Sequence, residues 1–160
     1  MSDAEAQLAE VQLDGFIAKF DPANQALIRD VRAALKSRFP TGFELVWDNY
    51  NFLVIATCTS ERPSDAIVSL AAGANGVGLS FYRGAELDDP AGVLLGEGVQ
   101  NRFIRLPDAS VLARPEVAAL IDQAAEKTRI PLPANGTGKL IIRSISAKQR
   151  PRRYDQGARR

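Results

Sequence analysis

The chain has 160 residues, of which 46% are hydrophobic and 24% charged, and its 20 basic and 19 acidic side chains give a net charge of +1. These values are typical of one globular domain and exclude a disordered, fibrous or membrane class, since the longest strongly apolar stretch, residues 52–57, is far shorter than the roughly 20 residues that cross a bilayer. Histidine is absent and Cys58 is the single cysteine, which excludes histidine-dependent catalysis, internal disulfides and multi-cysteine metal sites.

Two helices are predicted in the first forty residues. Apolar side chains recur at helical spacing between Leu13 and Phe20, which predicts a short helix that ends near Phe20 and follows a weaker, frayed turn beginning at Ala4. Asp21 and Pro22 form a helix start signal, and a second apolar face then extends to Phe39 before Pro40. The second helix is therefore the more sharply defined of the two.

The middle of the chain has the composition of β-strands. Residues 43–47 and 52–59 are rich in aromatic and branched side chains and are separated by turn-forming residues, so they predict a hairpin. Residues 66–72 and 77–82 flank a glycine-containing turn at residues 73–76 and predict a second hairpin. Together the four strands predict an antiparallel meander.

The second half of the chain begins with an irregular stretch. Residues 83–100 hold four glycines and one proline, residues 102–106 form a fifth short strand, and Pro115 opens a last amphipathic helix. A late strand follows at residues 139–145. The order of elements predicts an α+β fold with two layers, in which a mostly antiparallel sheet of five to six strands carries helices on one face.

The ends of the chain differ in charge. Residues 147–160 carry six basic side chains against one acidic, and they have little apolar surface to bury, so we expect a disordered tail after a single domain at residues 1–146. That domain carries 14 basic and 18 acidic side chains and is mildly acidic. Residues 1–5 are polar and acidic, unlike a secretory signal, and this favours a cytoplasmic location. We expect a monomer or a homodimer.

Several linked segments together resemble a known family. These are residues 44–51 (ELVWDNYN), 87–98 (LDDPAGVLLGEG), 102–106 (RFIRL) and 114–121 (RPEVAALI). The pattern is similar to the YdhG-like bacterial domain of unknown function and covers roughly residues 16–125. The resemblance implies a two-layer α+β domain and no particular reaction.

Some members of that family have been linked to frataxin-like delivery of iron, so the resemblance also implies an iron chaperone as one alternative. Such a role requires an acidic, oxygen-rich surface. The densest acidic group here is Asp88 and Asp89 near Glu86, which is smaller than a long acidic helix ridge. We therefore expect no metal site from the residues themselves.

The turn between the first two predicted strands holds the leading candidate site. Trp47, Asp48, Asn49, Tyr50 and Asn51 concentrate hydrogen-bonding groups and aromatic surface in five residues, as the recognition of a small polar ligand requires. The alternative is a hairpin turn whose Asx side chains cap their own backbone. Both interpretations stay open, and both can hold together.

Two arginines on the fifth predicted strand form a second candidate. Arg102 and Arg105 are three residues apart, so on a strand they point to opposite faces and one of them at most faces a given pocket. Arg102 with backbone amides of the loop at residues 92–98 would make an anion site. The alternative is a surface arginine paired with a carboxylate such as Glu97.

Other patterns are weaker. The segment at residues 136–139 (GTGK) departs from a phosphate-binding loop at Pro133 and Leu140, and residues 96–98 (GEG) lack the third glycine of a dinucleotide fingerprint. Cys58 alternates with small apolar residues on its strand and is expected to be a buried hydrophobe.

A basic stripe lies on the second predicted helix, where Arg29, Arg32 and Lys36 recur at helical spacing. With the basic tail it could bind nucleic acid through phosphate charge. A solvated helix face is the commoner explanation, and the acidic balance of residues 1–146 opposes binding to RNA or DNA.

These observations favour a non-enzymatic binding or accessory module that recognises a small ligand, a metal or a protein partner, without a cofactor. Three alternatives remain: an enzyme that uses Asp48 and Tyr50 with an arginine anchor, an iron chaperone, and a nucleic-acid accessory protein acting through its basic tail.

Overall fold

The computed structural model describes residues 2–154. None of the helices in this range is both long and apolar enough to cross a membrane. The elements, in chain order, are α1 (Asp3–Ile17), α2 (Pro22–Arg38), β1 (Phe43–Asp48), β2 (Leu53–Cys58), β3 (Ala66–Gly73), β4 (Gly76–Phe81), β5 (Arg102–Leu106), α3 (Pro115–Glu126) and β6 (Leu140–Ile145).

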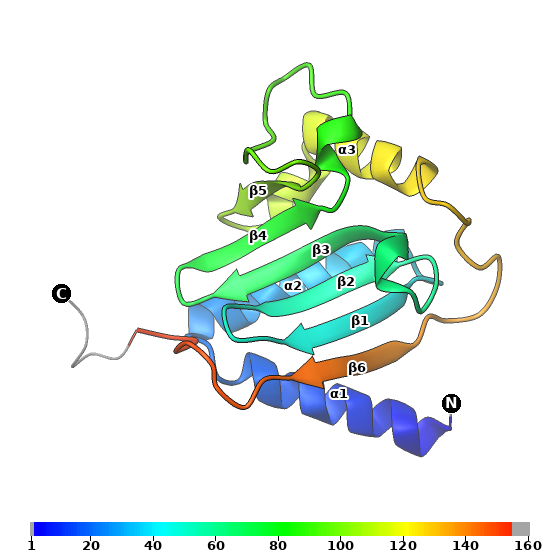
Figure 1. The fold of residues 1–160 in the computed structure, drawn as a ribbon. Coiled ribbons are helices and arrows are strands. Elements are labelled where there is room, and N and C mark those ends of the chain that lie inside the picture. The colour runs from blue at the N-terminus through cyan, green and yellow to red at the C-terminus, as the bar shows by residue number, and fades with distance from the viewer. Residues whose placement is uncertain (1, 155–160) are drawn as a thin grey trace.

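The six strands form one sheet in the order β5-β4-β3-β2-β1-β6. All neighbours are antiparallel except β6, which runs parallel to β1 at the edge of the sheet far from β5 (Figure 1). The predicted α+β class with a mostly antiparallel sheet is confirmed. The parallel pair arises because the chain crosses from β5 to the opposite edge through α3 before it forms its last strand.

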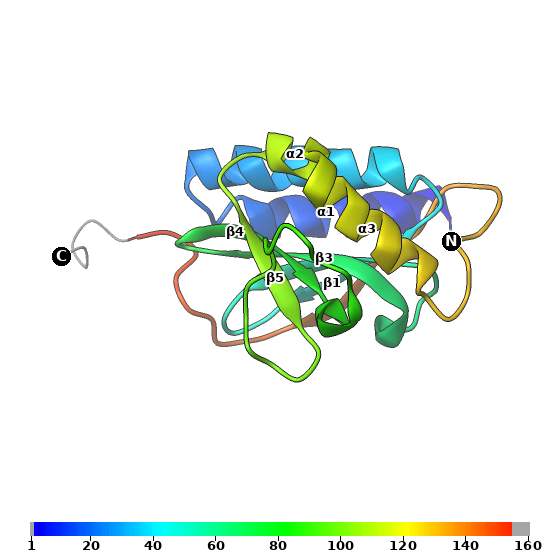
Figure 2. The ribbon, with the colours of Figure 1, turned by 90° about the horizontal axis from the view of Figure 1, so that it is seen from above.

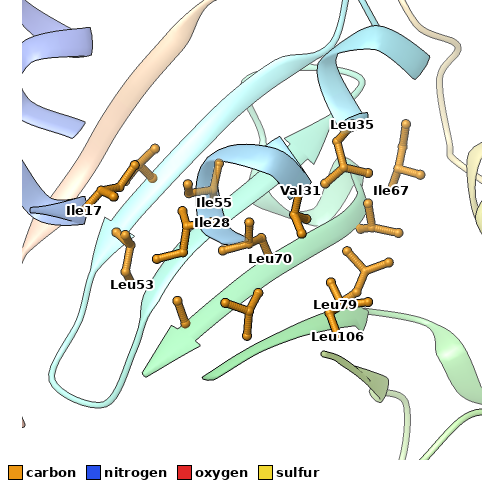
Figure 3. Close-up of a cluster of buried hydrophobic side chains, with 14 of the residues drawn as sticks. Ile17, Ile28, Val31, Leu35, Leu53, Ile55, Ile67, Leu70, Leu79 and Leu106 are labelled. Carbon is orange, nitrogen blue, oxygen red and sulfur yellow. The ribbon is translucent and has the colours of Figure 1, made fainter. Parts of the chain in front are cut away.

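The three α-helices cover one face of the sheet; the opposite face, here called the open face, carries no α-helix, although Leu45, Ala56 and Cys58 on its β1–β2 part are buried. Figure 2 shows α1, α2 and α3 on the same side of the strands. In Figure 3, Ile28 and Val31 of α2 lie against Ile55 and Leu70 of the sheet, and these side chains are almost fully buried. The alternation of strand side chains gives the sheet a buried helix-side face and a second face that the helices do not touch.

The first helix is longer than the sequence predicts. It runs without a break from Asp3, because the Ser2 hydroxyl accepts from the Glu5 amide while the Glu5 carboxylate accepts from the Ser2 amide. This capping box satisfies backbone donors that are otherwise unpaired at a helix start. Ala9, Leu13 and the residues after them then anchor the helix in the core.

Residues 147–154, the first part of the predicted tail, pack along the β1–β2 hairpin. The Arg150 amide donates to the Tyr50 carbonyl (2.9 Å), and the Arg152 residue is 4% exposed. A cationic side chain this deeply buried requires partners. Residues 155–160 of the predicted tail lie outside the described residues.

Candidate functional site

The structure divides the five residues of the predicted hairpin site among three environments. Trp47 lies on the open face of the sheet, and Asp48, its neighbour on β1, points to the helix side and is fully buried. Tyr50 and Asn51 are exposed at the hairpin turn, and Asn49 is half-buried. The five residues share a turn but do not converge on one pocket.

Asp48 holds a buried ion pair. Its carboxylate accepts from Lys19 Nζ (2.6 Å) and from Arg152 Nη2 (2.8 Å), and its backbone carbonyl accepts from the Gln149 side chain (2.9 Å). Burial by itself opposes ionisation, yet the hydrogen bonds from Lys19, Arg152 and Gln149 outweigh it and lower the pKa of Asp48. The carboxylate is therefore charged and fully engaged.

The C-terminal segment closes this arrangement, which we call the clasp (Lys19, Asp48, Gln149, Arg152 and Arg153). Arg152 also donates to the Asn49 carbonyl (2.5 Å), and Arg153 donates to the Phe20 carbonyl (2.6 Å) just beyond α1. The clasp joins the end of α1, the hairpin and the C-terminal segment. Its geometry gives Asp48 a structural role and does not favour an enzyme in which Asp48 is the acid or base.

Arg102 lies far from the hairpin. It is on β5, four strands from β1 in the sheet, a separation of roughly 19 Å at the usual strand spacing. Its guanidinium donates to the carbonyls of Gly98 (2.5 Å) and Asn101 (2.8 Å). Arg102 thus holds the loop before β5 through carbonyl groups, and the ion pairs among residues 2–154 include none between Arg102 and Glu97.

The open face of the sheet carries a row of small side chains between larger ones. Strand register places Trp47, Val54, Ala71, Gly78 and Arg105 side by side across five strands. The middle of this row has almost no side-chain bulk. Figure 1 views the sheet from this face, with α1 and α2 behind it.

The adjoining row also has small side chains between larger ones. It runs from Leu45 and Ala56 through Ser69 and Ser80 to Phe103 on β5. The loop between β4 and β5 extends beyond the sheet on this side, away from the helices (Figure 2). The side chains of this face are therefore small over β3 and β4, and larger ones stand on β1 and β5.

The β3, β4 and β5 ends of these rows line a groove of about 890 Å³, which also extends past the β3–β4 turn to Asn24 and Leu27 of α2. Its floor includes Ala71, Gly78 and Ser80, and the rings of Phe52 and Phe103 stand on either side of it. The Phe52 ring lies over Gly73, where an added Cβ would come within 3.3 Å of it. An apolar hollow with a few polar groups is the usual form of a small-molecule site.

Polar groups in this groove are few: Asn24 and Asn75 lie near the β3–β4 turn, and Ser80, Asn101 and Arg105 lie toward β5. Arg105 is exposed, and its guanidinium lies 5.6 Å from the centre of the Phe103 ring. Ser80 donates a hydrogen bond to the Asn101 side chain (2.6 Å). Of the two arginines on β5, Arg105 lines the groove, whereas the predicted site residue was Arg102.

The acidic residues weighed against the iron alternative form hydrogen bonds within and beside the β4–β5 loop. The Asp89 carboxylate accepts from the backbone amides of Val93 (3.0 Å) and Leu94 (2.9 Å). The Asp88 backbone exchanges two hydrogen bonds with the Gln123 side chain on α3. In the part of the chain that the structure describes, no three acidic or thiol side chains gather as a metal site would require.

The basic stripe on α2 is ion-paired within the molecule. Arg32 binds Glu10 of α1 (2.9 Å) and Glu44 of β1 (2.8 Å), and Arg29 binds Asp14 (2.9 Å). The stripe thus joins α2 to its neighbours and is more than a solvated face. Its charge is largely balanced by these carboxylates, which weakens the case for phosphate binding there.

Cys58 lies on the open side of the sheet in a small apolar cluster with Leu45 and Ala56, and it is fully buried. Burial raises the pKa of its thiol to about 12. The thiol is therefore protonated at neutral pH, as expected for a buried hydrophobe.

The sequence did contain a signal for the groove. Small residues occupy every second position on two neighbouring strands: Ser69, Ala71 and Gly73 on β3, and Gly76, Gly78 and Ser80 on β4. Such alternation gives one face of a strand pair almost no bulk. The burial of Arg152 could not be predicted in the same way, because nothing in the residues around a basic side chain in a polar segment indicates that it is buried.

The fold and the geometry of the groove can be set beside known proteins. The resemblance to the YdhG-like family is a prediction from the sequence, and its segments fall on β1, on the loop before β5, on β5 itself and on α3. Comparisons of the chain with protein-family models, curated proteins and solved structures give no significant match.

Proposed function

We propose that this protein is a non-enzymatic binding module that holds a small, largely apolar ligand in the groove on the open face of its sheet. The observation that carries the proposal is the groove itself. Its volume of about 890 Å³ falls within the range of small-molecule sites, and its floor is nearly free of side chains.

Two further features support this proposal over a role for the hairpin. The hairpin carboxylate, Asp48, is buried, and its two oxygens bind Lys19 and Arg152, so it is not accessible to a ligand. The groove has the opposite character, because its aromatic walls are partly exposed: Phe52 is 49% exposed. Such surface gains free energy when a ligand covers it.

Membership of the YdhG-like family is part of the same proposal. Two of the segments that carry the resemblance, residues 87–98 and 102–106, belong to the loop and the strand that border the groove. If the family shares a binding function, we expect its ligands to occupy the equivalent of this face. A family-wide role in iron delivery has no support from the residues around Asp88.

Replacement of Ala71 by phenylalanine tests the proposal. The new ring would occupy the groove floor without a backbone change, since Ala71 lies in a regular strand and aromatic residues favour strands. The probe is N-phenyl-1-naphthylamine, a neutral dye that fluoresces in apolar sites. We expect the wild-type protein to bind it at micromolar concentration and Ala71→Phe to weaken binding at least tenfold.

Ala33→Phe is the matched control, because Ala33 is exposed on α2 and lies outside the groove. Far-UV circular dichroism and thermal unfolding would verify that both variants fold. Equal dye binding by the wild type and by Ala71→Phe, or no binding by the wild type, would remove the groove as the site.

A further inference from the structure

The groove is electrostatically one-sided. Arg105 is the one charged side chain among the described residues that line it, and none of those residues carries a carboxylate. Arg105 also takes no part in the ion pairs formed among residues 2–154, whereas Arg32 and Arg152 each bind carboxylates. A cation without a partner at an apolar site favours an anionic ligand group.

Arg105 lines the groove from the β5 side. It lies opposite Gly78 in the β4–β5 register, and Gly78 has no side chain to stand between the guanidinium and the groove. The neighbouring Phe103 ring supports the guanidinium from one side at 5.6 Å. An anion at the β5 edge of the groove would therefore lie near a guanidinium that the Phe103 ring already holds in position.

The remaining space suits a flat apolar body. Phe52 lies beside Gly73, and Phe103 is in register with Ser80 and Ser69, so their backbones are three strand spacings apart across the sheet and four residues apart along it, roughly 19 Å in all. The floor between them is formed by Ala71, Gly78 and the hydroxyl of Ser80. A planar ring system of one or two rings fits between two aromatic walls on such a floor.

From this geometry we propose that the ligand is a free small molecule with a flat apolar body and one anionic group, a carboxylate or sulfonate, that Arg105 binds. This inference rests on the proposed function and adds the chemical class of the ligand. Phe52 and Phe103 flank the apolar body, and Arg105 determines the preference for the anion.

A pair of matched dyes tests the inference. 8-Anilinonaphthalene-1-sulfonate and N-phenyl-1-naphthylamine share the same ring system, and the first adds one sulfonate. We expect the wild-type protein to bind the sulfonate about tenfold more tightly than the neutral dye. We expect Arg105→Gln to abolish that difference and to leave the affinity for the neutral dye unchanged.

Arg143→Gln is the control for charge, because Arg143 is an exposed arginine on β6, at the opposite edge of the sheet. It should preserve the preference for the sulfonate. If Arg105→Gln keeps that preference, or if Arg143→Gln loses it equally, the anion is bound elsewhere and the inference is overturned. Binding of both dyes that Ala71→Phe does not weaken would instead overturn the proposed function.

Discussion

Asp48→Asn removes the charge from the centre of the clasp and should be among the most damaging polar substitutions in the protein. The Arg152 side chain is 2% exposed, and its Nε has no hydrogen-bond partner among residues 2–154. Without the carboxylate, a guanidinium stays buried with carbonyl groups as its main acceptors. Breaking a buried ion pair by removing one partner costs about 3–5 kcal/mol, a large part of the roughly 5–15 kcal/mol that stabilises a typical domain.

The reverse substitution should cost less. Arg152→Met leaves Asp48 paired with Lys19, which is 41% exposed and partly hydrated, and the methionine can still pack near the Phe20 ring that Arg152 covers at 6.0 Å. We expect a loss of about 2 kcal/mol. The double variant should resemble Arg152→Met alone, because the stranded cation is then absent, so the two effects should not add.

Urea unfolding followed by the fluorescence of Trp47, the single tryptophan, and by circular dichroism measures these differences. Lys19→Met is the control from the same network, and its exposed charge should contribute less than about 1 kcal/mol. A cost below about 1 kcal/mol for Asp48→Asn, or additive effects of Asp48→Asn and Arg152→Met, would refute the structural role assigned to the clasp.

The clasp also predicts a pH dependence. Because the pKa of Asp48 is lower in the folded state than in the unfolded chain, its contribution to stability is present above pH about 4 and is lost as the pH falls through the folded pKa. Unfolding free energies measured between pH 6 and 2 should therefore fall more steeply for the wild type than for the Asp48→Asn/Arg152→Met variant, and parallel curves would contradict this. Two glycines should behave oppositely in thermal unfolding: Gly138→Ala should cost about 1–3 kcal/mol, because its Cβ would overlap the Gly42 carbonyl. Gly15→Ala, with open space around it in α1, should gain up to about 1 kcal/mol, and equal effects of the two would refute this packing argument.

The fold was predictable because its signals are local. The spacing of apolar residues before Pro40 predicted α2, and the alternation of branched and aromatic residues predicted the strands that the structure contains. The extent of α1 was underestimated, because its first turns are stabilised by the Ser2–Glu5 capping box more than by apolar contacts. The parallel pairing of β6 with β1 depends on a long crossing that no local pattern encodes.

The candidate site was harder to predict, since it depends on which side chains from different strands share a face of the sheet. Alternation on β1 separates Trp47 from Asp48, and strand order places Arg102 about four strands from both. Composition made the C-terminal segment resemble a free tail, yet one buried carboxylate binds Arg152 and orders it. Long-range ion pairs of this kind form between residues that are far apart in sequence, here 104 positions.

By itself, the sequence determined the α+β class, the helix and strand positions, and the absence of histidine chemistry, because residue types and their spacing act over a few neighbours. The tertiary structure decided which side chains share a surface. It buried Asp48 against Arg152, and it brought the small residues of β3 and β4 beside Phe103 and Arg105 on one open face. Strand register and sheet order set these neighbours, and both are fixed by packing over the whole domain.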